Sequence, residues 1–180
     1  MTAQIQDTFL FKGDRYFLIG IQGGNLISPE QFGMEPVILN TACYRGFYAT
    51  YELTEKGLFL KELTLREKND KYLPIQGIEP TKGDYQASYY GLNVAVPYTG
   101  KIRLAKDLIK EFHVHLGFQK AIAYKTVLDV SLENGRIVEF KDRSKEVEQK
   151  RRTFILLKDR VPSWNIIQEI NKAFSLDMDL

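Results

Sequence analysis

The sequence predicts a single α+β domain over residues 1–180, built mainly from antiparallel β-hairpins, and three observations carry this prediction. Apolar residues alternate with polar residues over several short stretches, which is the period of a half-buried strand. Turn sequences such as Asn134-Gly135 separate these stretches. Two other stretches have the apolar spacing of a helix. A chain of 180 residues buries enough surface for one core without disulfides or a metal.

The first third of the chain predicts two hairpins. Residues 9–11 and 16–21 flank Lys12-Gly13-Asp14, and the aromatic-rich stretch 44–53 is turned back at residues 54–57 into the apolar stretch 58–65. Between them, Ser28 followed by proline is a helix-start pattern, but nearby Gly33 and Pro36 leave room for only one or two helical turns.

The middle of the chain predicts a third hairpin followed by an internal helix. Residues 92–96 and 102–104 alternate on either side of the turn at residues 97–100. From Leu104 the apolar period becomes helical, which predicts a helix near residues 104–115 that Gly117 would end.

The strongest turn signal is Asn134-Gly135, because a type I′ turn needs φ > 0 at both central residues. A two-residue turn would place Leu132 opposite Ile137. Val138 and Phe140 instead favour the other face of the return strand, and a β-bulge would reconcile the two registers.

The remaining segments complete the predicted domain. Residues 69–91 form a loop, residues 145–152 a solvated helical turn or a mobile loop, and residues 154–157 a strand. A C-terminal helix near residues 163–175 has one apolar stripe and would cover an open face of the sheet. A barrel-like or two-sheet core is favoured over an open sheet, because about eight short strands in an open sheet would leave long free edges.

Two parts of the sequence have a similar pattern of turns and strands. Residues 8–68 and 92–142 would then be two halves of an internal repeat related by a pseudo-two-fold axis, followed by a C-terminal extension at residues 143–180. The alternative is a chance recurrence of short β patterns.

The amino-acid composition indicates which kinds of binding partner and which cellular setting to expect. Lys and Arg number 25 against 23 Asp and Glu, so no strong positive field marks a nucleic-acid or membrane partner. The single Cys43 excludes an internal disulfide framework and favours a reducing, cytoplasmic setting. No signal-peptide pattern or apolar run of membrane-spanning length is visible.

The only histidines are His113 and His115. On a strand they would share a face and could bind one metal, with Asp107, Glu111 or Asp129 as a third ligand. At the end of the predicted helix they point apart, and the favoured interpretation is a histidine stabilised by the helix dipole. No metal and no cofactor is therefore expected.

Two further motifs allow a catalytic and a structural interpretation. Cys43 would be a nucleophile only if a histidine came close, with Arg45 lowering its pKa; buried free cysteine is the more common case. Gly20, Gly23 and Gly24 resemble a phosphate-binding loop, but no Lys-Ser/Thr follows them and turn glycines fit better.

Tyrosine and arginine residues around the aromatic strand are the most suggestive feature. Tyr and Arg are enriched in contact surfaces, although tyrosine also favours strands for its own sake. Candidate binding residues are Arg45, Tyr48, Tyr51, Tyr89, Tyr90, His113 and His115.

Two functions follow from these residues. The first is a non-enzymatic interaction module of the kind found in the bacterial cytosol, whose partner is another protein bound through the Tyr/Arg-rich strand surface. The alternative is a small enzyme or a barrel that binds a small ligand in a pocket near Tyr48, Tyr51, His113 and His115. The absence of a catalytic triad, Walker loop, paired-carboxylate motif or CxxC favours the first.

Overall fold

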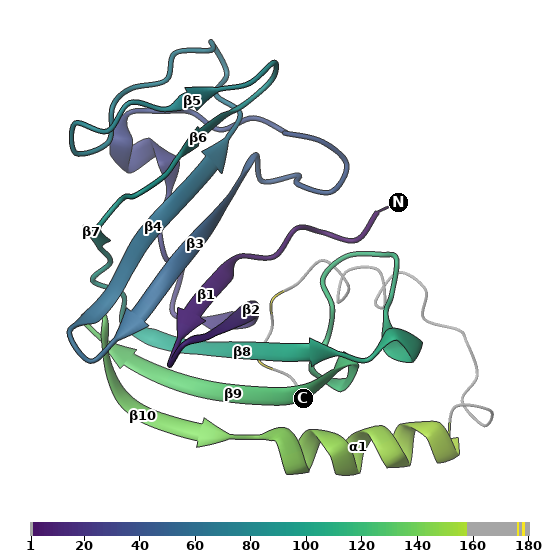
Figure 1. Ribbon diagram of the computed structural model, residues 1–180. Helices are drawn as coiled ribbons and strands as arrows, with labels where there is room; N and C mark the ends of the chain where they lie inside the picture. The colour runs from purple at the N-terminus through teal and green to yellow at the C-terminus, as the bar shows by residue number, and fades with distance from the viewer. Residues whose placement is uncertain (1, 158–175, 177, 179–180) are drawn as a thin grey trace.

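The computed structural model describes residues 2–157, 176 and 178. These residues form a mixed ten-stranded sheet and one α-helix, which confirms the strand-rich α+β prediction (Figure 1). The strands are β1 (Thr8–Phe11), β2 (Asp14–Gln22), β3 (Phe47–Thr54), β4 (Gly57–Leu65), β5 (Thr81–Lys82), β6 (Ala87–Tyr89), β7 (Val94–Ala95), β8 (Gly100–Leu108), β9 (Tyr124–Glu133) and β10 (Arg136–Asp142). The helices are α1 (Ser144–Leu157) and the 3₁₀ turns η1 (Pro29–Phe32), η2 (Lys110–Phe112) and η3 (Ala121–Ala123).

The strands form one continuous sheet in the order β10-β9-β8-β2-β1-β3-β4-β6-β5, with β7 paired to β4. The prediction of a barrel-like or two-sheet core is corrected, because the sheet is single and does not close into a barrel. The β1–β2 hairpin is the reason: β1 pairs in parallel with β3, while β2 pairs with β8, so the hairpin joins two groups of strands. Figure 1 shows β3 and β4 rising from the layer that β8, β9 and β10 form.

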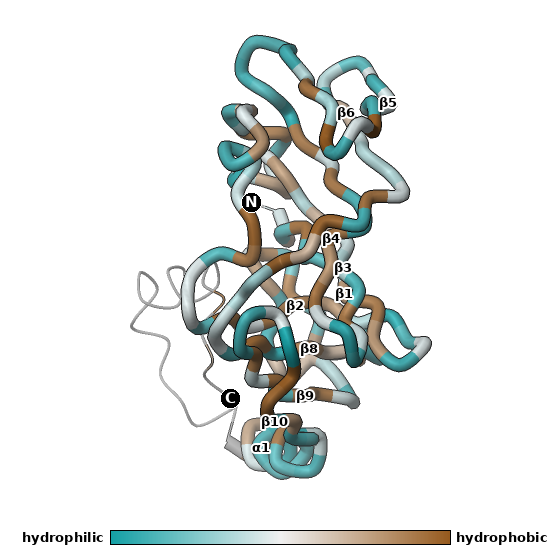
Figure 2. Tube along the Cα trace, turned by 90° about the vertical axis from the view of Figure 1, so that its left-hand side faces the viewer, coloured by the Kyte–Doolittle hydropathy of each residue, from teal (hydrophilic) through white to brown (hydrophobic). Residues whose placement is uncertain are grey.

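Alternating side chains place the main core on one face of the sheet. β8 illustrates the alternation, since Ile102 and Leu104 join the main cluster while Ala105 joins a smaller cluster on the opposite face. Val147 of α1 and Tyr124 pack into that smaller cluster, so α1 and η3 cover the outer face of β8 and β9. Figure 2 shows the hydrophobic positions along the strands and the hydrophilic ones at the loops.

Three predicted hairpins are confirmed, namely β1–β2, β3–β4 and β9–β10. In the last of these, Leu132 lies opposite Ile137 and the register shifts between Ile137 and Glu139. The bulge at Val138 therefore returns Phe140 to the same face as Ile137. η1 confirms the predicted helical turn, because it ends at Gly33 in a left-handed conformation with φ 76°.

The predicted helix at residues 104–115 is wrong. β8 extends to Leu108, and only the three-residue η2 follows. Residues 102–105 are all buried because β8 lies between β2 and β9 and is covered on both faces. A strand that is buried on both faces does not show alternating apolar and polar residues in its sequence. The apolar residues that follow happen to have helical spacing.

Three further predictions need correction. β7 pairs with β4 rather than with β8, so residues 92–104 form no hairpin. The predicted loop at residues 69–91 contains β5 and β6, and the strand predicted at residues 154–157 is the end of α1.

The internal repeat is not confirmed, since the helix that its second half required is absent from residues 104–115. The helix predicted at residues 163–175 lies outside the described residues. Within the described part of the chain, no helix is long and apolar enough to cross a bilayer.

Candidate functional site

A buried aspartate just before β1 is the centre of the candidate site. Asp7 is 3% exposed, and one of its carboxylate oxygens accepts hydrogen bonds from the Arg45 guanidinium and from the Ala49 N–H, the latter at 2.8 Å. The Asp7 backbone carbonyl accepts the Leu18 N–H at 2.9 Å. A buried carboxylate needs such partners, so these bonds fix Asp7 between β2 and β3.

Arg45 lies in the turn that leads into β3, and its side chain is 34% exposed. Its Nε donates to the Phe47 carbonyl at 2.7 Å, and its guanidinium carbon lies 4.5 Å from the centre of the Phe47 ring. Burial disfavours the charge, but the adjacent Asp7 carboxylate raises the pKa of Arg45 above its ordinary value. The guanidinium is therefore charged, and its contacts with Asp7 and Phe47 fix its orientation.

Tyr51 reaches the same place from the middle of β3. Its side chain is 1% exposed, and its ring centre lies 5.0 Å from that of Phe9. Burial raises the pKa of Tyr51 well above its ordinary value, and the Asp7 charge acts in the same direction. The phenol therefore keeps its proton and can donate a hydrogen bond.

Asp7, Arg45 and Tyr51 line a pocket of about 140 Å³, called the Asp7 pocket here. Among the described residues, both hydrogen bonds to the Asp7 carboxylate go to the same oxygen, so its second oxygen and the Tyr51 hydroxyl are left for other partners. The volume corresponds to roughly four or five water molecules. The other lining residues are mainly apolar: Leu18, Ile21, Asn25, Leu26, Ile27, Phe47 and Leu176.

Cys43 lies next to this site but does not have the properties of a nucleophile. Its side chain is buried, and its thiol donates to the Phe47 carbonyl at 3.2 Å. Burial raises the pKa of the Cys43 thiol, and the nearby Arg45 only partly offsets that effect. A protonated thiol supports the structural interpretation of this residue.

The tyrosines predicted from the sequence do not gather on one surface. Tyr51 and Tyr89 are fully buried, Tyr48 is half-buried, and Tyr90 is exposed. The Tyr89 hydroxyl donates to the Leu73 carbonyl at 2.7 Å, and burial raises the pKa of Tyr89 to about 12. Of the predicted residues, Arg45 and Tyr51 line one pocket together.

His113 and His115 lie in the loop after η2, with ring centres 4.7 Å apart. Gln119 holds this loop: its side chain donates to the Val114 carbonyl at 2.6 Å and accepts the Val114 N–H at 2.9 Å. Within residues 2–157, 176 and 178, no three His, Cys, Asp or Glu side chains are placed to hold a metal. Neither histidine lines the Asp7 pocket.

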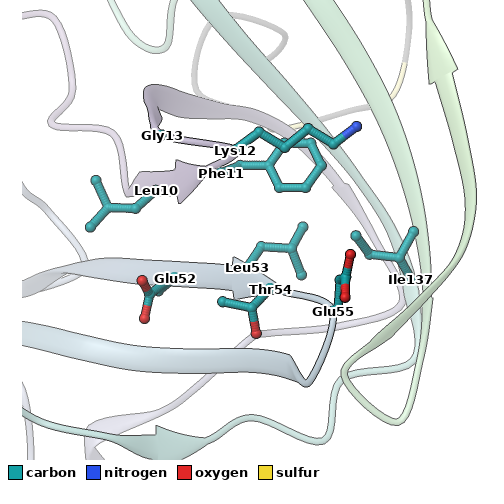
Figure 3. Close-up of a pocket in the computed structure, with 9 residues that line it drawn as sticks. All are labelled: Leu10, Phe11, Lys12, Gly13, Glu52, Leu53, Thr54, Glu55 and Ile137. Atoms are coloured by element: carbon teal, nitrogen blue, oxygen red, sulfur yellow. The ribbon is translucent and has the colours of Figure 1, made fainter.

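A larger and more open pocket of about 540 Å³ lies at the tips of β1 and β3, beside the start of β10. Figure 3 shows Phe11, Leu53, Glu55 and Ile137 pointing toward a common space, whereas Leu10 points away from it. Of the charged residues of this tip pocket, Lys12 and Glu55 lie in exposed hairpin turns, and the partly exposed Glu52 lies on β3. The tip pocket therefore lacks the buried polar groups that distinguish the Asp7 pocket.

Sequence reasoning missed Asp7. This residue stands in a polar stretch with no motif around it, and its partners Arg45 and Ala49 are distant in sequence. A long-range pairing of this kind leaves no local pattern. Comparisons of the chain with protein-family models, with curated proteins and with solved structures find no match.

Proposed function

We propose that the protein is a non-enzymatic binding module and that the Asp7 pocket holds a small polar ligand. The observation that carries this proposal is that Asp7 and Tyr51 line a mainly apolar pocket, where both hydrogen bonds to the Asp7 carboxylate go to one of its two oxygens. A few convergent polar groups on an apolar wall are the usual composition of a small-molecule site. Arg45, another candidate from the sequence, lines the same pocket.

The open groups define the chemistry of the ligand. The Asp7 carboxylate accepts a hydrogen bond from an ammonium or hydroxyl group, while the protonated Tyr51 donates to a ligand oxygen. Leu18 and Phe47 supply apolar contact for a short carbon chain. A small amino alcohol has these features and fits the volume of about 140 Å³.

Binding rather than catalysis is supported by the charge state of the site. Asp7 and Arg45 compensate each other, and burial keeps the Tyr51 and Cys43 side chains protonated, so no activated nucleophile is present among them. A cytoplasmic setting, without a nucleic-acid or membrane partner, accords with the single cysteine and the balanced charge.

A titration with ethanolamine, followed by the backbone amide NMR signals, tests the proposal. We expect shifts at Leu18 and Ala49, whose N–H groups bond to Asp7, and no shifts at these residues with acetate. Tyr51→Phe should weaken binding by about fivefold to tenfold, because it removes one hydrogen bond of roughly 1 kcal/mol.

Tyr124→Phe is the matched control, since Tyr124 is also buried but its hydroxyl bonds to Gln6 outside the pocket. This variant should bind ethanolamine as the wild type does. Equal shifts with acetate, or an equal loss of binding in both tyrosine variants, would contradict the proposed site.

A further inference from the structure

β10 is the outermost strand at one end of the sheet. Figures 1 and 2 both place it there, and among the described residues no strand pairs with its other edge. It also carries exposed apolar side chains, Val138 at 55% and Phe140 at 43%. A free edge with apolar side chains is a template for another strand.

The register of the β9–β10 hairpin indicates which backbone groups face this free edge. The two-residue turn makes Glu133 and Arg136 the first hydrogen-bonded pair of the hairpin, and pairs then alternate. After the bulge, Phe140 lies opposite Val130. The Arg143 N–H donates to the Val127 carbonyl, so by alternation the pair of Phe140 and Val130 is one that is not hydrogen-bonded. We therefore expect the N–H and C=O of Phe140 to point away from β9, toward the free edge.

The residues that flank Phe140 have opposite charges and lie on the other face of the strand. Glu139 accepts a hydrogen bond from Ser131 at 3.2 Å, and Lys141 lies opposite Asp129, so both are on the outer face. In an antiparallel copy of β10 centred on Phe140, each Glu139 would lie opposite the partner's Lys141. The two Phe140 residues would face each other and exchange both backbone hydrogen bonds.

Other registers are less favourable for a second copy. A two-fold axis through Glu139 places two carboxylates directly opposite each other, and an axis between Val138 and Glu139 places Arg136 opposite Lys141. Like charges in these positions are destabilising. Only the register centred on Phe140 combines two opposite-charge pairs with an aromatic pair.

We propose that the protein forms a symmetric homodimer in which β10 pairs with β10 of a second copy, centred on Phe140. The contacts of the Phe140 ring within its own chain support this arrangement. The centre of the ring lies 5.9 Å from that of Phe11 and 4.8 Å from the Lys12 ammonium. A second Phe140 would add to this cluster beside the tip pocket, which Phe11 and Lys12 also line. The sheet of one copy then continues into the sheet of the other.

Charge reversal tests the register. In sedimentation equilibrium of the full chain we expect a wild-type dimer at concentrations of tens of micromolar. Glu139→Lys and Lys141→Glu each create two like-charge pairs, so each should raise the dimer dissociation constant by roughly 10- to 100-fold. An equimolar mixture of the two variants should form a heterodimer, and a chain with both substitutions should dimerise as the wild type does.

Lys125→Glu is the matched control, because Lys125 is exposed on β9 and does not lie on the free edge. It changes the net charge by the same amount as Lys141→Glu and should leave the dimer unchanged. Circular dichroism of each variant checks that the fold is retained. A monomeric wild type at 100 µM, or variants whose mixture does not dimerise, would overturn the proposal.

An oxidation experiment gives an independent measure of the register. Hydrogen-bonded opposite residues have Cα atoms about 5.5 Å apart, within the range of a disulfide. Phe140→Cys should therefore form an intermolecular disulfide, whereas Val138→Cys should not. Cys43 is buried and is the same in both variants. Equal cross-linking of both variants would exclude an axis at Phe140.

Discussion

Gly135 lies directly against Val96: a Cβ atom on Gly135 would come within 2.5 Å of the Val96 carbonyl oxygen. Gly135 also has a φ of +78°, in the left-handed region that side chains disfavour. The tip of the β9–β10 hairpin is thus fixed both by its own turn and by the segment after β7. The Gly135 N–H donates to the Tyr98 carbonyl at 2.8 Å, which completes this contact.

Gly135→Val should lower the stability of the protein for both reasons. Backbone strain alone costs about 1–3 kcal/mol, which corresponds to a fall in Tm of roughly 2–12 °C for a chain of this size. Gly83→Val is the control, since a Cβ there would make only an ordinary contact at 3.4 Å with the Gln86 carbonyl. An equal fall in Tm in both variants would refute this account of the hairpin.

Asp129→Ala should strongly lower the stability of the protein. Arg103 is 3% exposed, and its Nε and Nη2 donate to the two Asp129 oxygens at 2.6 and 2.9 Å. Removing the carboxylate takes both of these charge-assisted hydrogen bonds away from a buried guanidinium, which should lower the free energy of unfolding in urea by about 3–5 kcal/mol.

The control for this prediction is Glu148→Ala, which breaks the exposed pair of Glu148 with Arg152 on α1. An exposed pair of this kind contributes at most about 0.5 kcal/mol. Similar losses of unfolding free energy from Asp129→Ala and Glu148→Ala would show that Arg103 and Asp129 do not form the buried pair described above.

Stability should fall at alkaline pH, and Tyr89 should account for part of that fall. Burial raises its pKa from 10.0 to about 12, so the folded state holds the proton more tightly than the unfolded chain does. This contribution is complete below pH 10 and decreases as the pH rises toward about 12.

Urea midpoints measured from pH 8 to pH 12 would test this dependence. Tyr89→Phe should show a smaller decrease with pH than the wild type. Tyr85→Phe should not, because Tyr85 is 70% exposed. The same alkaline decrease in all three proteins would rule out Tyr89 as its source.

Gln119→Ala should loosen the loop that carries His113 and His115. Gln119 is 6% exposed, and both of its side-chain hydrogen bonds go to the backbone of Val114. Losing a bond of about 1 kcal/mol should speed amide exchange at Val114 by roughly fivefold in mass spectrometry. Gln149→Ala, at an exposed position of α1, should leave that exchange unchanged.

The parts of the fold that the sequence predicts correctly are local. Lys12-Gly13, Lys56-Gly57 and Asn134-Gly135 all mark real turns, because each turn geometry depends on the residues within it. β8 is the clearest failure, since its inner residues are covered on one face by the main core and on the other by α1 and η3. Local periodicity carries no information about cover supplied by distant segments.

The sequence predicts the candidate site only in part, for the same reason. The Tyr/Arg pattern near one strand indicates Arg45 and Tyr51, and both line the Asp7 pocket. No local pattern indicates Asp7, because its role depends on a contact with Arg45 across a long stretch of sequence. The Tyr/Arg pattern places Tyr89 on a surface, but its side chain packs in the main core and its hydroxyl donates to the Leu73 carbonyl.

The position of the β1–β2 hairpin has a consequence for synthesis of the chain on the ribosome. β2 is made before its second neighbour β8, which begins only at Gly100, so one edge of the hairpin stays open while the residues between them are translated. At about 5–20 residues per second that interval is at least several seconds. Contacts between distant segments also slow folding itself. The nascent chain thus exposes an apolar strand edge for seconds, and this is the stage at which chaperones would bind.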